Sequence, residues 1–311
     1  MSVSVLVPSR NERFLIPTVQ DVLTKATGDL EVIVTLDDCS DAAFAALTAE
    51  APFLLADSRV VLLQQPKAIG MREAINVAAA AAKGDYLMKI DGHVLMAPGF
   101  DLALQAEIEP NWVVVPRRYA LDPIHWCIAA DRPFIDYHYL SWPYVDPANP
   151  GMHGRWWRER QRDRATVDFD DDMSSQGSCW FMSRHHWFNN LHGLSPIGYD
   201  SFIQEYQELG GKTWLGGGAC KTNKRTWYAH LHKGKTYGRG YRVSKSGWAN
   251  GVKYSADMWM NDRWPDRVHD FTWYLDKFWP VPTWPITANG DLDLDAYRDA
   301  QLRIAAAMEQ P

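Results

Sequence analysis

Cysteine is scarce in this chain of 311 residues, and Cys39, Cys127, Cys179 and Cys220 show no close pairing. This spacing suggests neither a zinc ribbon nor a disulfide framework, and a reducing compartment is the default expectation. The chain also lacks the roughly 18 consecutive apolar residues of a membrane-spanning helix. Its first apolar run, residues 3–7, is too short for a signal peptide and follows no basic residue. We therefore expect a cytoplasmic protein without a membrane partner.

Tryptophan is absent from the first 111 residues, whereas all 15 tryptophans lie between Trp112 and Trp284. The two parts are thus built from different residues, which argues against a repeat architecture. With 32 basic and 38 acidic residues the net charge is −6, and 46% of the residues are hydrophobic. This composition is that of an ordinary globular protein. The acidic total does not exclude a nucleic acid, because the local distribution of charge decides such binding.

The first 116 residues alternate between strand and helix patterns. Strands are expected over residues 3–7, 30–36, 59–63, 85–90 and 112–116, and helices over 18–25, 42–49 and 71–83. This alternation predicts an α/β fold whose mostly parallel sheet is covered by helices on both faces. Ligands of such sheets bind beyond the carboxyl ends of the strands. Polar clusters follow Val7, Leu36 and Ile90, so a ligand site is expected there.

The rest of the chain is less regular. Residues 117–166 carry no clear period, which is typical of a functional loop, and include the arginine-rich stretch Arg155–Arg164. A strand is expected over 178–183, a helix over 201–209 that stops at Gly210 and Gly211, and a last helix over 294–308. Residues 221–245 contain eight Lys or Arg and no acidic residue.

Three groups of residues can carry chemistry. Asp91 and His93 are two apart at a strand end and can face one divalent cation, for which Mn²⁺ fits better than Ca²⁺. The alternative is a turn aspartate beside a solvent-exposed histidine. Asp37 and Asp38 can cap the following helix or accept hydrogen bonds from a nucleobase. The segment 230–235 is either a metal ligand with a phosphate clamp or a solvated basic loop.

The order of these elements resembles family 2 glycosyltransferases with the GT-A fold. The similar segments are Val3–Glu12, Val32–Asp41 with its Asp-Asp-x-Ser turn, Gly70–Asn76, and Asp91-Gly92-His93 in the place of the Asp-x-Asp metal motif. The last of these matches the Asp-x-His form of the polypeptide N-acetylgalactosaminyltransferase branch. Gln176–Ser183 resembles the strand that lines the donor sugar.

The resemblance implies an enzyme, a glycosyltransferase that uses a nucleotide-sugar donor, UDP-linked by analogy. It also implies a divalent cation, Mn²⁺ before Mg²⁺. It implies a GT-A domain over 1–245, divided into a nucleotide half (1–116) and an acceptor half (117–245), with a Trp- and Pro-rich extension over 246–311. The implied metal ligands are Asp91, His93 and His230. The implied donor-binding residues are Pro8, Arg10, Glu12, Asp37, Asp38, Gly70, Arg72, Asp91, Gly92, Gln176, Lys233, Lys235 and Arg239.

Two further assignments concern the reaction itself. Lys233, Lys235 and Arg239 are expected to form a mobile lid over the phosphates, with neighbouring glycines that allow closure. An inverting enzyme needs a base near the acceptor hydroxyl, for which we expect Asp200 first and Glu205 second. The Asp-x-His relatives retain configuration and use no such base, so both stereochemical outcomes stay open.

The acceptor is predicted from the aromatic and basic residues of the second half. Trp156, Trp157 and Trp180 are expected to contact it, because indole rings stack on sugars and on unpaired bases. The second half of the sequence resembles phage-encoded glycosyltransferases, so the leading acceptor is a hydroxymethylated pyrimidine in DNA. The reaction would then take place in the host cytoplasm. A saccharide or glycan is the alternative. A nucleotidylyltransferase or a non-catalytic sugar-nucleotide-binding module is disfavoured, because residues 8–12 lack glycine and both Asp91 and His93 are present.

Overall fold

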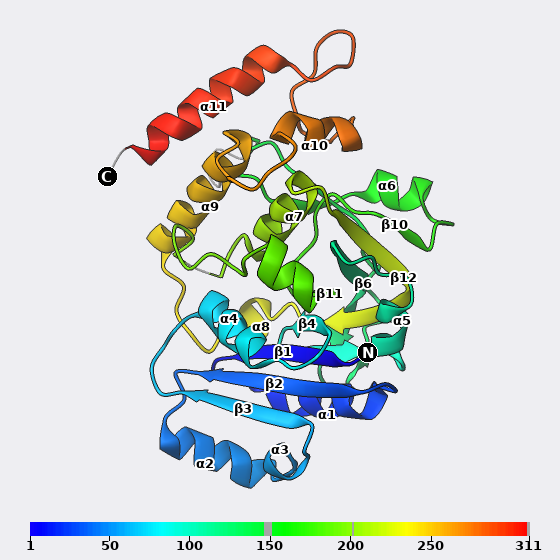
Figure 1. The fold of residues 1–311 in the computed structure, drawn as a ribbon, viewed down its shortest axis with the longest axis vertical. Coiled ribbons are helices and arrows are strands. Elements are labelled where there is room, and N and C mark those ends of the chain that lie inside the picture. Colours follow the sequence, from blue (N-terminus) through cyan, green and yellow to red (C-terminus); the bar gives the residue numbers. More distant parts are fainter. Residues whose placement is uncertain (146–150, 201, 310–311) are drawn as a thin grey trace.

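The first four predicted strands form one parallel block in the structure, a computed structural model that describes residues 1–145, 151–200 and 202–309 (Figure 1). They lie in the order β3–β2–β1–β4, with bounds β1 (Val3–Ser9), β2 (Leu30–Asp37), β3 (Val60–Gln65) and β4 (Tyr86–Ile90). Val5 of β1 pairs with Val32 on one side and Met88 on the other, and all three side chains are fully buried. Burial on both faces explains why β1 is an unbroken apolar run.

Helices cover this block much as the sequence predicts. Their bounds are α1 (Leu15–Lys25), α2 (Asp41–Glu50), α3 (Phe53–Ala56), α4 (Met71–Ala81) and α5 (Phe100–Gln105). Helix α4 packs on β1 and β2 through small buried side chains such as Ala74 and Ala78. It ends two residues before its expected end, and the chain then passes so close to β1 that a Cβ on Gly84 would lie 2.7 Å from the Ser4 nitrogen. Gly84 is therefore a close-approach residue.

The second half extends the sheet but makes it mixed. Its strands are β5 (Val94–Met96), β6 (Trp112–Asp122), β10 (Phe169–Asp171), β11 (Cys179–Ser183) and β12 (Ala219–His230). Strand β11 is antiparallel to both β4 and β6, whereas β12 runs parallel to β6 and antiparallel to β5 and β10. The α/β fold class is confirmed. Parallel pairing holds within β3–β2–β1–β4 and between β6 and β12, and the other neighbours are antiparallel.

The segment expected as one long loop contains short elements. Strand β6 runs on to Asp122, and β7 (Cys127–Ile128), β8 (His138–Leu140), β9 (Gly154–Trp156) and α6 (Arg158–Asp163) follow. Within the Arg155–Arg164 stretch, Arg160 and Arg164 both pair with Asp170, at 3.3 and 2.8 Å. Part of the arginine charge is therefore neutralised within the fold. Residues 146–150 of the expected loop lie outside the described residues.

Helix α7 differs from the sequence prediction. It spans Glu205–Leu215, so it starts later than the expected position 201, which lies outside the described residues, and continues through Gly210 and Gly211. A Cβ on Gly211 would lie 2.9 Å from the Trp259 ring. Gly211 therefore permits helix α9 (Lys245–Met260) to pack closely on α7, and this packing overrides the low helix propensity of glycine.

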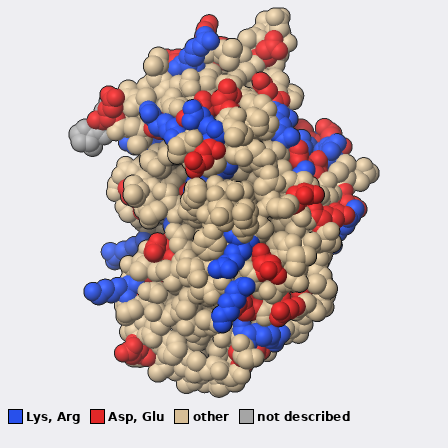
Figure 2. Space-filling model, in the orientation of Figure 1, with Lys and Arg blue, Asp and Glu red and all other residues tan. Residues whose placement is uncertain are grey.

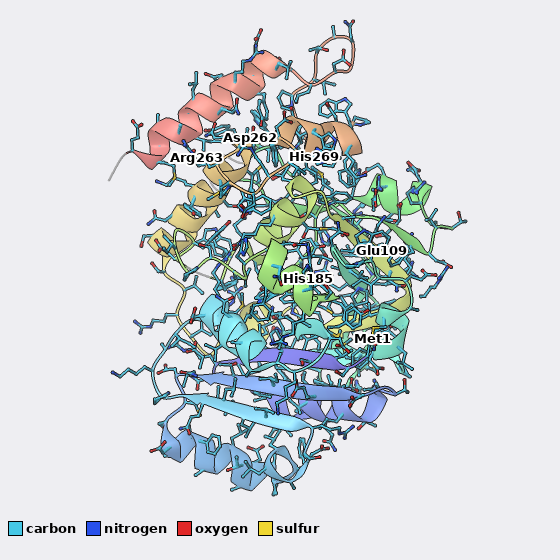
Figure 3. All side chains as sticks on the ribbon, in the orientation of Figure 1. Met1, Glu109, His185, Asp262, Arg263 and His269 are labelled. Atoms are coloured by element: carbon cyan, nitrogen blue, oxygen red, sulfur yellow. The ribbon has the colours of Figure 1, made fainter. Side chains whose placement is uncertain are left out.

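The remaining elements carry the end of the chain. They are the π-helical turn η1 (His186–Asn190), α8 (Gly234–Tyr237), α9 (Lys245–Met260), α10 (Phe271–Phe278) and α11 (Leu294–Met308). Helix α11, at the predicted position, packs on α9. Asp262, Arg263 and His269 lie where α9 leads into α10 (Figure 3). Trp284 donates from Nε1 to the Leu140 carbonyl at 2.7 Å and is buried, as expected for a packing residue. The domain boundary at residue 245 stays a prediction.

Among the described helices, none combines the length and the apolar composition that a membrane crossing requires.

Candidate functional site

The polar clusters after β1, β2 and β4 open into one cleft of about 1200 Å³. This is the edge at which the sequence predicted a ligand site. Most of the predicted site residues line it, namely Pro8, Arg10, Glu12, Asp37, Gly70, Arg72, Asp91, Gly92, His93, Gln176, Asp200, Glu205, His230, Lys233, Lys235 and Arg239. Asp38, Trp156, Trp157 and Trp180 are not among the lining residues.

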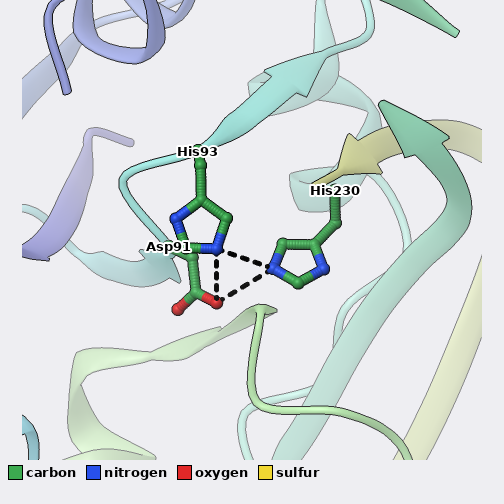
Figure 4. Close-up of side chains that lie close together, drawn as sticks. All are labelled: Asp91, His93 and His230. Carbon is green, nitrogen blue, oxygen red and sulfur yellow. Dashed lines mark hydrogen bonds and ion pairs between the residues drawn. The ribbon is translucent and has the colours of Figure 1, made fainter. Parts of the chain in front are cut away.

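Asp91, His93 and His230 meet at the floor of this cleft (Figure 4). Asp91 and His93 lie between β4 and β5, and the pairing of His230 with Val94 brings the end of β12 beside them. The Nε2 atom of His230 lies 3.1 Å from Asp91 Oδ2 and 3.1 Å from His93 Nε2, and the third separation is 3.7 Å. An ion bound at about 2.1 Å by each ligand needs ligand atoms about 3 to 3.5 Å apart, so the geometry fits a divalent cation.

The charge states of His230 and Asp91 suit a cation as well. Burial lowers the pKa of His230 to about 3, so the imidazole is neutral and has a free lone pair. Burial would raise the pKa of Asp91, but the charge of Lys89 outweighs it and holds that pKa well below its ordinary value. One carboxylate and two imidazoles are a suitable ligand set for Mn²⁺.

Glu12 lies directly behind His93. Its Oε2 accepts a hydrogen bond from His93 Nδ1 at 3.0 Å and is also paired with Lys233. With the His93 proton on Nδ1, the Nε2 lone pair points toward Asp91 and His230. A Cβ on Gly92 would lie 2.8 Å from Glu12 Cγ, so glycine in the Asp-Gly-His motif makes room for this carboxylate.

Lys89 is a buried lysine that the sequence analysis missed. Its ammonium group donates to Asp91 Oδ1 at 2.7 Å, to the Gly177 carbonyl at 2.5 Å and to Glu205 Oε2 at 3.1 Å. Trp180 donates to the other oxygen of Glu205 at 2.7 Å. Burial raises the pKa of Glu205, with Lys89 acting in the opposite direction. Both carboxylate oxygens of Glu205 are therefore occupied. A lysine within the otherwise apolar strand 86–90 was the available sequence signal.

The acidic pair Asp37 and Asp38, at the end of β2, is not the helix cap. Ser40 caps α2 by accepting from the Ala43 amide at 3.2 Å. Asp37 accepts from the backbone amides of Ile69 and Gly70, at 2.7 and 3.2 Å, and thereby fixes the loop before α4. Asp38, at φ +61°, is exposed and pairs with Arg10 at 2.6 Å. The N-cap alternative for this pair is therefore wrong.

The other predicted site residues take different places in the cleft. Arg72 is buried, pairs with Glu208 and donates to the Ile203 carbonyl at 2.8 Å. Asp200 is exposed, and Nδ2 of Asn250 lies 3.4 Å from its Oδ2. The segment with Lys233, Lys235 and Arg239 lies over the loop after β1, where Asn11 donates to the Gly240 carbonyl at 3.1 Å.

Two of the three tryptophans predicted to contact the acceptor are packing residues. Trp180 is 0% exposed and stacks on Trp187, with ring centroids 5.1 Å apart. Trp157 is 6% exposed, and Trp156 donates to Gln161 at 2.9 Å, with Arg158 stacked over its ring. Burial leaves Trp157 and Trp180 no face for an acceptor, so that assignment is corrected.

The cleft is instead lined by aromatic residues that the sequence analysis missed: Phe202, Tyr241 and Trp248, all half-buried. The Phe202 ring lies 6.2 Å from the Tyr241 ring and 6.1 Å from the Trp248 ring, centroid to centroid. We call these three residues the aromatic wall. No periodic pattern in the sequence distinguishes them from the other aromatic residues.

The parallel block with its antiparallel extension is a GT-A fold, and the candidate metal ligands Asp91, His93 and His230 lie at its strand ends. The sequence profile described as "Glycosyl transferase family 2" matches residues 4–187, and the chain belongs to that family. The enzyme class expected from the sequence, a glycosyltransferase, is confirmed at the level of this family.

Similar proteins include polypeptide N-acetylgalactosaminyltransferase 5 of Caenorhabditis elegans, 25% identical over 89% of this chain and 48% of that protein. Putative polypeptide N-acetylgalactosaminyltransferase 9 of Drosophila melanogaster is 24% identical over 86% of this chain and 44% of its own length. This chain thus spans less than half the length of these two relatives.

Solved structures support the fold. The crystal structure of GalNAc-T7 with UDP, GalNAc and Mn²⁺ has a TM-score of 0.68 and 16% identity, covering 92% of this chain and 59% of that one. The structure of S. aureus TarS has a TM-score of 0.57 and 14% identity, covering 88% of this chain and 41% of that one. At these identities the likeness concerns the fold alone.

Proposed function

We propose that this protein is a metal-dependent glycosyltransferase that moves a sugar from a UDP-linked donor to an acceptor hydroxyl. The observation that carries the proposal is the convergence of Asp91, His93 and His230 on one point of the cleft. A divalent cation bound there would neutralise the charge that develops on the leaving diphosphate. The relatives named for transferring N-acetylgalactosamine, and the fold neighbour with UDP and Mn²⁺, support this donor class.

The chain's own residues have distinct proposed roles around that point. Asp91, His93 and His230 would hold the cation, and Glu12 would orient His93 rather than touch the nucleotide. Asp37 would keep the loop before α4 in place for the nucleotide. Lys233, Lys235 and Arg239 would close over the phosphates. If the reaction inverts configuration, Asp200 is the better base, because it is exposed in the cleft whereas Glu205 is bound by Lys89 and Trp180.

For the acceptor we propose a polypeptide hydroxyl. The two relatives are named for polypeptide acceptors, and the aromatic wall offers ring faces on the open side of the cleft. The features that favoured DNA are engaged elsewhere, since Arg160 and Arg164 pair with Asp170 and Trp157 is buried. On the face drawn in Figure 2, basic side chains are interspersed with acidic ones instead of forming one band.

The test of the donor uses Mn²⁺ and a panel of UDP-sugars that includes UDP-N-acetylgalactosamine, with released UDP as the readout. We expect slow hydrolysis of at least one donor, and a loss of at least about 100-fold in Asp91→Asn. A matched control is Asp122→Asn, because Asp122 forms an exposed pair with His125 at 2.7 Å. If no donor is hydrolysed, or Asp91→Asn retains full rate, the metal-dependent transferase is refuted.

The acceptor is tested with the donor found in this way. Transfer is measured onto Ser/Thr-rich peptides, oligosaccharides and hydroxymethylated DNA in parallel. We expect incorporation into the peptide and a reduced rate in Trp248→Ala. Incorporation into the DNA or the oligosaccharide alone would contradict the polypeptide acceptor while leaving the transferase reaction intact.

A further inference from the structure

Arg118 is a buried cation whose charge is not balanced by a carboxylate. It lies on β6 and is 5% exposed. Across residues 1–145, 151–200 and 202–309, no Asp or Glu lies within ion-pair distance of its guanidinium. Its neighbour Arg117 provides the contrast, because it pairs with Asp136 at 2.7 Å. An arginine side chain does not lose its proton in a protein, so the charge of Arg118 persists.

Both partners of Arg118 line the cleft. Its Nη1 donates to the amide oxygen of Gln176, and lies 3.4 Å from Nε2 of His232. A guanidinium can only donate hydrogen bonds, so the side-chain oxygen of Gln176 accepts from Arg118. The NH₂ group of Gln176 is then left to donate to a ligand. In the same way His232 accepts at Nε2 and carries its proton on Nδ1. Arg118 thus turns two adjacent lining residues into hydrogen-bond donors.

Positive groups outweigh the negative one around the recess formed by Gln176 and His232, because Arg118 and Arg132 act on His232 more strongly than Asp91 does. His138 is buried next to Arg118 and His232, and burial together with these two groups keeps its pKa well below the ordinary value. Lys233 follows His232 directly on the chain, but is paired with Glu12. Burying a charge without a counter-charge destabilises the folded protein, unless a ligand supplies the missing charge.

We propose that Arg118 is a positioning residue that, through Gln176 and His232, forms a subsite for an anionic oxygen of a ligand in the cleft. The chemistry required is a phosphate or a carboxylate, carried by the donor's diphosphate or by an acidic group on the transferred sugar. The choice of ligand rests on the proposed function, whereas the preference for an anion rests on the uncompensated charge of Arg118. Because this charge is costly in the free protein, its removal stabilises the protein and weakens ligand binding.

The test compares Arg118→Met with Arg117→Met as a matched control on the same strand. Thermal unfolding of the free proteins is followed together with calorimetric titration of inorganic diphosphate, UDP with Mn²⁺, and UDP-linked glucuronate against UDP-linked glucose. We expect Arg118→Met to unfold at the same or a higher temperature and to lose about tenfold in affinity for an anionic probe. Arg117→Met should unfold at a lower temperature, because Asp136 loses its partner, with unchanged affinities.

The probes separate the sources of the anion. Weaker binding of diphosphate and UDP identifies the donor phosphates, whereas weaker binding of the glucuronate donor alone identifies a sugar carboxylate. Unchanged affinity for every probe, or a lower unfolding temperature of Arg118→Met without weaker binding, would overturn the proposal. If the wild type binds no UDP with Mn²⁺, the proposed function fails, and the diphosphate titration still decides the role of Arg118.

Discussion

Removal of the Glu12 carboxylate should weaken the metal centre without removing any of its ligands. Glu12 Oε2 accepts from His93 Nδ1 at 3.0 Å, and this bond fixes both the tautomer and the ring orientation of His93. Loss of such a partner typically costs about 10- to 100-fold in metal affinity, which corresponds to about 1.4 to 2.8 kcal/mol. Glu12→Ala should approach the upper value. Glu12→Gln should lie near the lower one, because its amide oxygen can still accept from His93.

The assay is titration of the free protein with Mn²⁺, followed by electron paramagnetic resonance of the unbound ion. Glu31→Gln serves as the control, since Glu31 accepts from the Ser4 hydroxyl at 2.6 Å and the Lys83 amide at 2.7 Å and does not line the cleft. Gly92→Ala should weaken Mn²⁺ binding in the same direction, because its Cβ would displace Glu12. Equal affinities in the wild type and Glu12→Ala would refute this role of Glu12.

Three further predictions concern stability and turnover. Burial lowers the pKa of His186 to about 4. Between about pH 6.5 and 4 only the unfolded state binds this proton, so the stability of the folded protein should fall as the pH drops through that range. In thermal unfolding, His186→Gln should flatten this pH dependence, whereas the substitution of the exposed neighbour, His185→Gln, should not. Gly211→Ala should cost about 1 to 3 kcal/mol in chemical denaturation, because its Cβ would press on Trp259. Asp200→Asn should reduce turnover about 100-fold or more if configuration inverts, and full turnover would exclude Asp200 as the base.

Most of the nucleotide half could be predicted from the sequence, because local pattern and burial agree there. The apolar runs of β1 and β2 are buried on both faces, so their composition is enough to identify them. The polar residues that follow these strands converge because parallel strands share one carboxyl edge. Asp91 and His93 could therefore be placed at the ligand-binding edge. Their spacing alone left a turn aspartate beside an exposed histidine open, and the resemblance to family 2 glycosyltransferases implied the metal ligands.

The second half could be predicted less well, because long-range packing decides its structure. Strand β12 is rich in Lys and Thr, and its identity comes from pairing with β6, more than 90 residues earlier. Gly210 and Gly211 look like helix terminators in the sequence, but α7 continues through both, and Trp259 packs against Gly211. From the sequence, Trp180 is expected to stack on the acceptor. In the structure it is buried, stacks on Trp187 and donates a hydrogen bond to Glu205. Lys89 pairs with nearby Asp91 but also with Gly177 and Glu205, which are distant in sequence. The side-chain partners of Arg118, Gln176 and His232, are likewise distant.

The central claim is that Asp91, His93 and His230 hold a divalent cation that supports sugar transfer from a UDP-linked donor. The most direct test is UDP release from UDP-sugars with and without Mn²⁺, measured for the wild type and His230→Gln. The account predicts release that requires Mn²⁺ and is lost in His230→Gln, while Asp122→Asn behaves like the wild type. Release that is independent of the metal, or undiminished in His230→Gln, would contradict it.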